Sequence, residues 1–456
     1  MDTIAAIATG LTDSGIGIIR LSGPEAITIA DRIFTPANRD TRLADLPGYR
    51  ACFGRIIYDD TVYDEAIALV MRAPKTYTRE DVVELNCHGG ISVLKKVLEL
   101  LISLGVRPAE PGEFTKRAFL NGRIDLAQAE SVMDLIHAKN DMAIASSLKQ
   151  LSGALGKTIR HLREKLLYNI AYIESALDDP ENYSLDGFDE KLTQLVDKLS
   201  ISIQSLLHSY DNGRLLTEGI RTVIVGKPNA GKSSVLNFLM GEERAIVTDI
   251  EGTTRDTLEE TINVDGITLS VVDTAGIRET DNTVEKIGIE KALSSIEEAD
   301  LILYIVDGTR PLDENDEEIM SKIKGKPSIT LLNKNDQQLV VDKLSISEKI
   351  DTHFLEISAL EHRGYEEFSS LLREMFFSNE VKSNSELMIT SARHKALLSE
   401  ALSSLDRVRE SINAGMGEDF YTIDLMAAYA SLGKILGEEL EDDLVDKIFS
   451  EFCMGK

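Results

Sequence analysis

The sequence is poor in three features that would mark other classes of protein: cysteine, long apolar runs and basic side chains. Its three cysteines, Cys52, Cys87 and Cys453, do not have the spacing of a zinc site or a disulfide framework, so neither is expected. No run approaches the ~18 apolar residues of a membrane span, and the N-terminus lacks the basic stretch of a signal peptide. We therefore expect a cytoplasmic protein that does not enter a membrane. The net charge of -28, from 77 acidic and 49 basic side chains, argues against nucleic-acid binding through a broad basic surface. A local basic patch or a basic partner is left open.

The hydrophobic pattern changes along the chain and predicts a multidomain α/β and α protein. Residues 1–120 have short apolar runs broken by Gly and Pro, which indicates an α+β domain. Residues 121–216 have the 3.6-residue period of helices, and this period returns in residues 380–456. Between them, in residues 217–379, strand-like runs alternate with helix-like segments, as in a parallel sheet covered by helices. The simplest architecture is an α/β domain inserted into one helical domain, although two separate helical domains would give the same pattern.

The apolar runs predict the individual strands. In the N-terminal part these are residues 16–20, 51–57, 66–71 and 82–86, followed by a helix over 92–103. In the inserted domain they are residues 221–225, 267–272, 301–306, 328–332 and 354–357.

A phosphate-binding motif follows the first strand of the inserted domain. The segment from Gly226 to Ser233 reads G-K-P-N-A-G-K-S, which fits G-x-x-x-x-G-K-S between a strand and a helix. Backbone N–H groups of such a loop surround phosphates, Lys232 would reach the β- and γ-phosphates, and the Ser233 hydroxyl would bind Mg²⁺. The sequence therefore predicts a P-loop nucleotidase.

Two later segments indicate that the nucleotide is GTP. The segment from Asp273 to Gly276 reads D-T-A-G and ends a strand, where it would place a carboxylate near the metal and an amide near the γ-phosphate. Residues 333–336 read N-K-N-D, and Asp336 can accept two hydrogen bonds from guanine that adenine does not offer. Residues 358–360, S-A-L, would complete the base pocket. In this order the motifs define a GTPase domain.

The site departs from a Ras-type site in the residue that orients water. Ile277 follows D-T-A-G where Ras-type enzymes have Gln, so another group must take that role. Residues 245–256 supply Thr254 as a second Mg²⁺ ligand and leave backbone carbonyls free for another cation. Asn229 could offer its side-chain oxygen to the same ion, which suggests that K⁺ neutralises charge between the β- and γ-phosphates. The alternative is that Asn229 only stabilises the turn of the loop.

Segments throughout the chain resemble the tRNA-modification GTPase family MnmE, also called TrmE. They read DTIAAIAT at 2–9, GIGIIRLSG at 15–23, PGEFTKRAFLN at 111–121, DLAQAE at 125–130 and FCMGK at 452–456. The resemblance implies an N-terminal domain that binds a tetrahydrofolate one-carbon donor, in 5-formyl or methylene form, and forms a homodimer. It also implies a helical domain that the GTPase domain divides into two parts.

The resemblance also implies roles for particular residues. A folate site would use Arg20, Glu84, Arg123 and Lys456. Ligands of K⁺ would be Asn229, Thr248, Ile250 and Thr253, and ligands of Mg²⁺ would be Ser233 and Thr254. Glu285 would act as general base through a water, although spacing alone favours a solvated charge at a helix start. Cys453 would take part in the modification chemistry, against the ordinary reading of a small buried thiol. The residues expected to bind nucleotide and ions are Asn229, Ala230, Gly231, Lys232, Ser233, Ser234, Thr248, Asp249, Ile250, Glu251, Gly252, Thr253, Thr254, Asp273, Thr274, Ala275, Gly276, Asn333, Lys334, Asp336, Ser358, Ala359 and Leu360.

The function implied is a K⁺-dependent GTPase that works with an FAD-containing, MnmG-like partner. Together they would install an aminomethyl or carboxymethylaminomethyl group at carbon five of the wobble uridine in certain tRNAs. One alternative is a ribosome-assembly GTPase related to Era or EngA, although the chain has a single phosphate loop and ends in C-M-G-K. Another is a GTP-regulated scaffold, which would not bind folate.

Overall fold

The chain divides into two compact units. The computed structural model describes residues 2–38, 40–241, 260–272, 296–377, 387–438, 442–450, 452 and 455. The first unit comprises residues 1–133, 150–200 and 397–456, and the second comprises residues 134–149 and 201–396. The domain boundaries expected at residues 120, 216 and 379 remain predictions.

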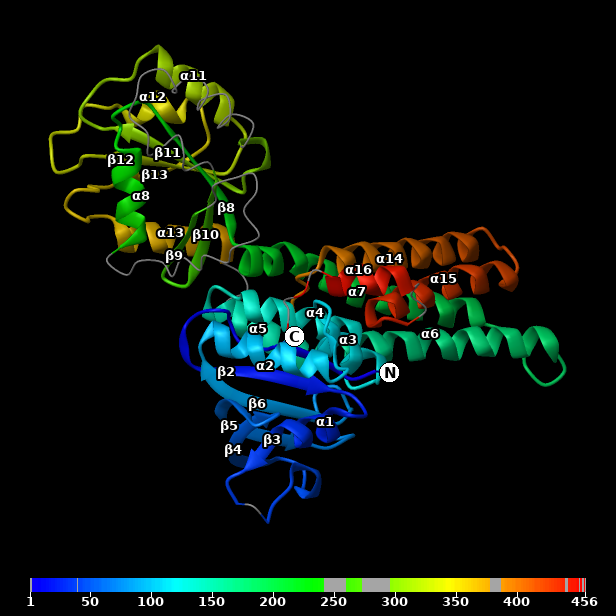
Figure 1. Ribbon diagram of the computed structural model, residues 1–456. Helices are drawn as coiled ribbons and strands as arrows, with labels where there is room; N and C mark the ends of the chain where they lie inside the picture. Colours follow the sequence, from blue (N-terminus) through cyan, green and yellow to red (C-terminus); the bar gives the residue numbers. More distant parts are fainter. Residues whose placement is uncertain are drawn as a thin grey trace. The chain divides into compact units, whose positions relative to one another are not determined.

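A seven-stranded sheet lies at the centre of the N-terminal part of the first unit (Figure 1). Its order is β3-β4-β5-β6-β2-β1-β7, and neighbours are antiparallel except for the pair of β1 and β7. The strands are β1 Ile4–Ile7, β2 Ser14–Ser22, β3 Phe34–Pro36, β4 Arg50–Tyr58, β5 Thr61–Met71, β6 Val82–Gly89 and β7 Arg107–Pro108.

The two faces of this sheet are buried differently because apolar residues alternate along its strands. Helices α1 (Ala26–Ile33) and α2 (Ile91–Ser103) cover one face, where they pack against inward-facing residues such as Ile19 and Leu85. The other face carries Arg20 and Glu84 and is covered only in part, by a small cluster that includes Phe114. A short 3-10 helix, η1 Leu43–Asp45, lies between β3 and β4.

The remaining helices are amphipathic. In α6 the buried residues include Leu155, Ile159, Leu162 and Leu166, at the spacing of one helix face, and α6 packs against α15. Their bounds are α3 Glu113–Leu120, α4 Leu126–His137, α5 Asp141–Leu151, α6 Ala154–Asp178, α7 Phe188–Glu218, α14 Ala392–Asn413, α15 Glu418–Leu436 and α16 Asp442–Ser450.

The second unit contains a six-stranded sheet of order β13-β12-β11-β8-β10-β9. Neighbours are parallel except for β9 and β10, which form an antiparallel hairpin. Helices α8 and α13 pack on one face of the sheet, and α11 and α12 pack on the other. The elements are β8 Ile220–Gly226, α8 Lys232–Met240, β9 Glu260–Val264, β10 Ile267–Val272, β11 Leu301–Asp307, α11 Glu314–Ile323, β12 Ser328–Asn333, α12 Lys343–Ser347, β13 His353–Glu356 and α13 Tyr365–Phe377.

These elements confirm the fold class predicted from the sequence, including each of the strands expected from the apolar runs. The short strands β1, β3 and β7 were not expected. Neither was β9. Its signal is the Asp265-Gly266 turn, in which both residues have positive φ, as the tightest hairpin turns require. Among the described residues, no helix is both long and apolar enough to span a bilayer.

Candidate functional sites

The phosphate loop joins the centre of the second sheet to the start of α8. It leaves β8, which lies between β10 and β11, and passes through Asn229 and Gly231 at φ of 64° and 98°. A Cβ atom on Gly231 would lie 2.3 Å from Asn333 Nδ2, so the loop needs glycine here for both conformation and space. The loop therefore ends at a helix N-terminus, where backbone N–H groups and the helix dipole favour a bound phosphate.

Lys232 lies across this loop. Its Nζ atom donates hydrogen bonds to the carbonyl oxygens of Gly226 (2.8 Å) and Lys227 (3.0 Å). Ser233 and Ser234 follow in the exposed first turn of α8. The ammonium and hydroxyl groups that the motif assigns to phosphate and Mg²⁺ thus lie in one short stretch at the helix start.

A second lysine of the loop, Lys227, ties it to α11. Its Nζ atom lies 2.6 Å from Asp316 Oδ2 and 2.9 Å from Asp313 Oδ2, and Asp316 also accepts a hydrogen bond from the Tyr304 hydroxyl. Burial lowers the pKa of Lys227, but the hydrogen bonds that its ammonium group donates to Asp316 and Asp313 outweigh this effect and raise the pKa. Lys227 therefore stays charged and holds the loop beside the start of α11.

Asn333 connects the phosphate loop with the predicted base pocket. It ends β12 and is 3% exposed. Its Nδ2 atom donates to the Ala230 carbonyl (3.0 Å), and its Oδ1 atom accepts from the Ala359 N–H (3.2 Å). One amide side chain thus satisfies two buried backbone groups that lie more than a hundred residues apart in the sequence.

Lys334 extends the same connection and brings in an acidic residue that the sequence analysis missed. Its Nζ atom lies 2.6 Å from Asp307 Oδ2 and 3.3 Å from the Asn229 carbonyl. Burial raises the pKa of Asp307, but hydrogen bonds from Lys334 and Thr309 outweigh it, so the pKa is lowered. Its position in the sequence could have identified Asp307, because it ends β11, the neighbour of the strand β12 that carries the N-K-N-D motif.

The residues expected to recognise guanine also lie together. The Ser358 hydroxyl donates to Asp336 Oδ1 at 2.7 Å, and this hydrogen bond is the main reason that the pKa of Asp336 lies below its usual value. Ser358 is fully buried, whereas Leu360 is 82% exposed. Asp336 is therefore ionised at neutral pH and can accept hydrogen bonds from a base.

Several expected site residues lie outside the described part of the chain. They are Thr248, Asp249, Ile250, Glu251, Gly252, Thr253, Thr254, Asp273, Thr274, Ala275, Gly276, Glu285, Cys453 and Lys456.

In the first unit, Arg20 and Glu84 form an ion pair on the partly covered face of the sheet. They are direct partners in the β2–β6 register, with 2.8 Å between Arg20 Nε and Glu84 Oε1. The Arg20 guanidinium lies 5.6 Å from the ring centroid of Phe114 and 5.9 Å from that of Tyr77. Its Nη1 atom donates to the Gly455 carbonyl at 3.4 Å, which brings the penultimate residue of the chain to this position.

Arg123 also contacts Tyr77. Its guanidinium is 4.6 Å from the centroid of that ring, within the range of a cation–π contact. Two of the residues expected to bind folate, Arg20 and Arg123, therefore contact one aromatic side chain, Tyr77, which the sequence analysis did not single out. Tyr77 and Arg123 also line an open cavity of about 470 Å³, together with Tyr49, Met71, Pro74, Lys75, Thr76 and Arg79.

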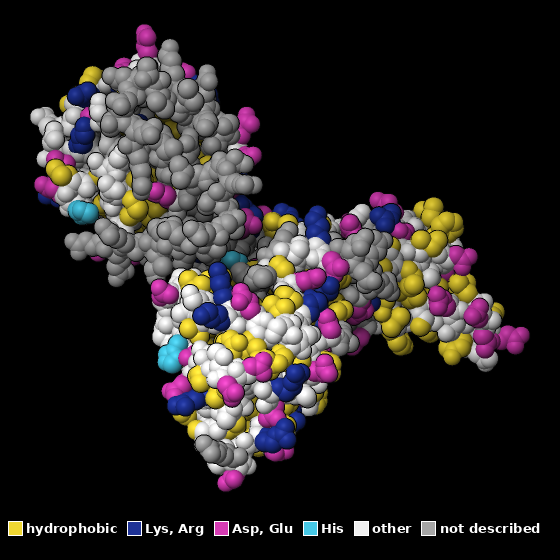
Figure 2. Space-filling view, in the orientation of Figure 1, with side chains coloured by type: hydrophobic (Ala, Val, Ile, Leu, Met, Phe, Trp, Pro, Cys, Tyr) yellow, Lys and Arg dark blue, Asp and Glu magenta, His cyan; other side chains and the backbone are white. Residues whose placement is uncertain are grey.

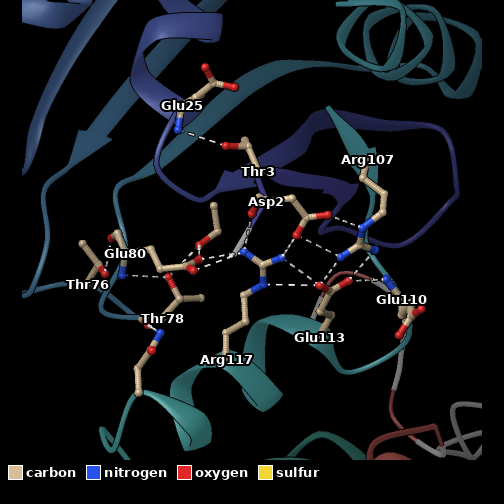
Figure 3. A network of polar contacts seen from close by, with 12 residues as sticks. Asp2, Thr3, Glu25, Thr76, Thr78, Glu80, Arg107, Glu110, Glu113 and Arg117 are labelled. Carbon is tan, nitrogen blue, oxygen red and sulfur yellow. Dashed lines mark hydrogen bonds and ion pairs between the residues drawn. The ribbon is translucent and has the colours of Figure 1, made fainter. Parts of the chain in front are cut away.

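A network of charged side chains fixes the loop that forms this cavity (Figure 3). Arg117, 3% exposed, contacts carboxylates of Asp2, Glu80 and Glu113 at distances of 2.8 to 3.1 Å. Burial raises the pKa of Glu113, but its hydrogen bonds with Arg107 and Arg117 outweigh this effect and lower it. Because these charges satisfy one another, we interpret the network as structural: it joins the first strand, the loop before β6 and helix α3.

The second sheet, with a phosphate loop between β8 and α8 and N-K-N-D after β12, defines the class of protein: a P-loop GTPase. Residues 126–453 match the family described as the MnmE helical domain, and residues 3–123 match that of the GTP-binding protein TrmE N-terminus. The chain belongs to the MnmE family, which confirms the resemblance found in the sequence.

Individual relatives match over the full length of the chain. A protein of Lachnoclostridium phytofermentans named tRNA modification GTPase MnmE is 50% identical, over 100% of this chain and 99% of its own. A protein of the same name from Clostridioides difficile is 45% identical, over 100% and 99%. Among solved structures, Era of Aquifex aeolicus is 29% identical over 41% of this chain and 66% of its own, with a TM-score of 0.25.

Proposed function

We propose that the chain is a K⁺-dependent GTPase that modifies carbon five of the wobble uridine in certain tRNAs. It would act in the cytoplasm as a homodimer, with an FAD-containing, MnmG-like partner and a tetrahydrofolate one-carbon donor. The observation that carries the proposal is full-length similarity to proteins named tRNA modification GTPase MnmE, together with a GTP site whose described residues lie in contact.

The geometry of Asn229 supports the K⁺ site. This exposed residue is held at positive φ, and its carbonyl accepts from Lys334. Asn tolerates this conformation better than most residues, as the turn-stabilising alternative expects. Within the described part of the chain, however, its side chain makes no hydrogen bond to the loop. Its amide oxygen is therefore available to a cation at the phosphates, where charge develops during hydrolysis. Ser233 and Thr254 would hold Mg²⁺, and Glu285 would position the attacking water.

The face of the first sheet that carries Arg20 and Glu84 supports the folate site and the homodimer. Arg20, Tyr77 and Arg123 offer cationic and aromatic contacts to a ligand with a flat ring and carboxylates. On the same face, Phe53 (57% exposed) and Ile67 (46% exposed) are direct cross-strand partners. A second copy of the chain would bury this apolar pair. Cys453 would act in the modification chemistry near this site.

The test is the GTP hydrolysis rate of the purified chain in K⁺ and in Na⁺ at matched ionic strength. We expect a K⁺-specific stimulation of about tenfold or more, because the cation replaces a charge-stabilising group whose removal usually has at least that effect. In the Asn229→Ala variant the stimulation should be lost while GTP affinity is kept. Equal rates in both salts would overturn the K⁺ assignment. A tRNA modification assay with the flavin partner would then test the remaining chemistry.

A further inference from the structure

Among the residues that the structure describes, the cavity beside Tyr77 is lined by three cations and by no acidic side chain. Lys75, Arg79 and Arg123 line it, and the other lining residues are neutral. This composition stands out in a chain with 77 acidic and 49 basic side chains. On the face shown in Figure 2, by contrast, acidic and basic side chains are interspersed. The cavity is therefore a local positive site on an acidic protein.

Glu80 and Asp81, the acidic residues nearest to Lys75 and Arg79 in the sequence, are bonded to other groups. Glu80 contacts Arg117 at 3.1 Å and accepts a hydrogen bond from the Ser22 hydroxyl at 2.7 Å. Asp81 accepts from the Ala73 N–H at 2.9 Å. The loop between β5 and β6 thus keeps its own acidic groups bonded to other partners and leaves its basic groups at the cavity.

The cations themselves have no carboxylate partner within the described part of the chain. Arg79 donates only to a neutral group, the Asn121 carbonyl, at 2.8 Å, and its backbone has a φ of 61°. Arg123 stacks on Tyr77. Both guanidinium groups are therefore held by neutral contacts that leave their charge available to a ligand with several anionic groups.

We propose that this cavity binds the oligo-γ-glutamate tail of a reduced folate. The inference rests on the proposed function, which places the folate against Arg20, Glu84 and Arg123, and it adds Lys75 and Arg79 as the residues that select the tail. A folate carries one carboxylate more than its number of glutamates. The first glutamate would be held at Arg123, which the proposed function already assigns to the folate, and two further glutamates would supply carboxylates for Lys75 and Arg79.

The test compares 5-formyltetrahydrofolate carrying one glutamate with the same compound carrying three, by equilibrium dialysis against the full chain. We expect the triglutamate to bind about tenfold more tightly, because each additional partly exposed ion pair contributes a factor of about two to five. The preference should shrink as salt is raised, since the pairs lie at the surface.

The variant Lys75→Gln with Arg79→Gln should lose the preference and keep the affinity for the monoglutamate. The matched control is Lys95→Gln with Lys96→Gln, which removes two exposed lysines from α2 and should keep the preference. Equal affinity of the wild-type chain for both folates overturns the tail site and leaves the folate function standing. If neither folate binds, the folate function fails and the tail site fails with it. If the folates bind equally and the double variant instead loses affinity for tRNA, the cations serve RNA and the tail site is overturned.

Discussion

Replacing Asn333 with Ala should destabilise the GTPase fold even when no nucleotide is bound. The side chain donates to the Ala230 carbonyl and accepts from the Ala359 N–H, at 3.0 and 3.2 Å. Ala230 and Ala359 are 1% and 8% exposed, so water cannot easily replace the lost partner at either backbone group. The substitution therefore leaves one buried donor and one buried acceptor unsatisfied.

The magnitude follows from these two groups. Leaving a buried polar group without its partner costs about 1–3 kcal/mol, so two such groups predict a loss of about 2–6 kcal/mol in the free energy of unfolding. The loss should appear locally, because Asn333 holds the phosphate loop and the loop after β13 against the end of β12. Nucleotide affinity should fall too, since both loops belong to the predicted site.

The assay is amide hydrogen exchange of the nucleotide-free full chain, read by mass spectrometry over β8, β11 and β12. Exchange there should become about 30-fold to 25,000-fold faster, which is the predicted loss of free energy expressed as a change in the opening equilibrium. Asn315→Ala is the matched control, because Asn315 is exposed in the first turn of α11 and its loss should change stability by less than about 0.5 kcal/mol. If Asn333→Ala weakens nucleotide binding while exchange in the free chain is unchanged, the residue acts only through direct contact and our reasoning is wrong.

Two further predictions concern buried groups away from the nucleotide. Asn140, 6% exposed, accepts from the Ala143 N–H and donates to the Leu216 carbonyl and the Thr268 hydroxyl. Its two backbone partners alone predict that Asn140→Ala costs about 2–6 kcal/mol and speeds exchange in the β9–β10 hairpin, and unchanged exchange there would contradict this. Burial, with a smaller contribution from Asp64, raises the pKa of the Cys87 thiol from 9.0 to about 12, so the folded chain keeps this thiol protonated to higher pH than the unfolded chain does. The stability that results is fully present below about pH 9 and is lost as the pH rises toward 12. At pH 8 iodoacetamide should label Cys87 far more slowly in the folded chain than in urea, and equal rates would refute the assignment.

The positions of the nucleotide motifs relative to one another could be predicted from the sequence, because the signal for each motif is local. The phosphate loop and the N-K-N-D segment each follow an apolar strand, and parallel strands bring their carboxyl ends to one edge of the sheet. The motifs that follow β8 and β12, which are separated by β11 in the sheet, are therefore expected at the same edge. Those motif residues that lie in the described part of the chain do come together there, while their roles in binding remain predictions.

Long-range contacts could not be predicted in the same way. The pairing of Lys334 with Asp307 depends on β11 and β12 being neighbours, and no motif marks Asp307. Arg117 belongs to a segment that was recognised only as a family signature, yet it contacts acidic residues from three separate parts of the chain. Such networks depend on which side chains a fold brings together, and single-sequence periodicity does not contain that information.

The two candidate sites differ in whether their lysine and arginine side chains form ion pairs with acidic side chains. Near the phosphate loop, Lys227 and Lys334 each form ion pairs with aspartates, and these pairs hold the loop in place. At the cavity beside Tyr77, Lys75 and Arg79 have no such partner among the described residues. A net charge of -28 opposes the approach of any anion, and screening at physiological salt limits this repulsion to about 8 Å. An anionic ligand is therefore attracted mainly by the few cations close to its binding site. In this chain, unpaired cations matter most where backbone amides and a helix dipole are not available to bind the anion.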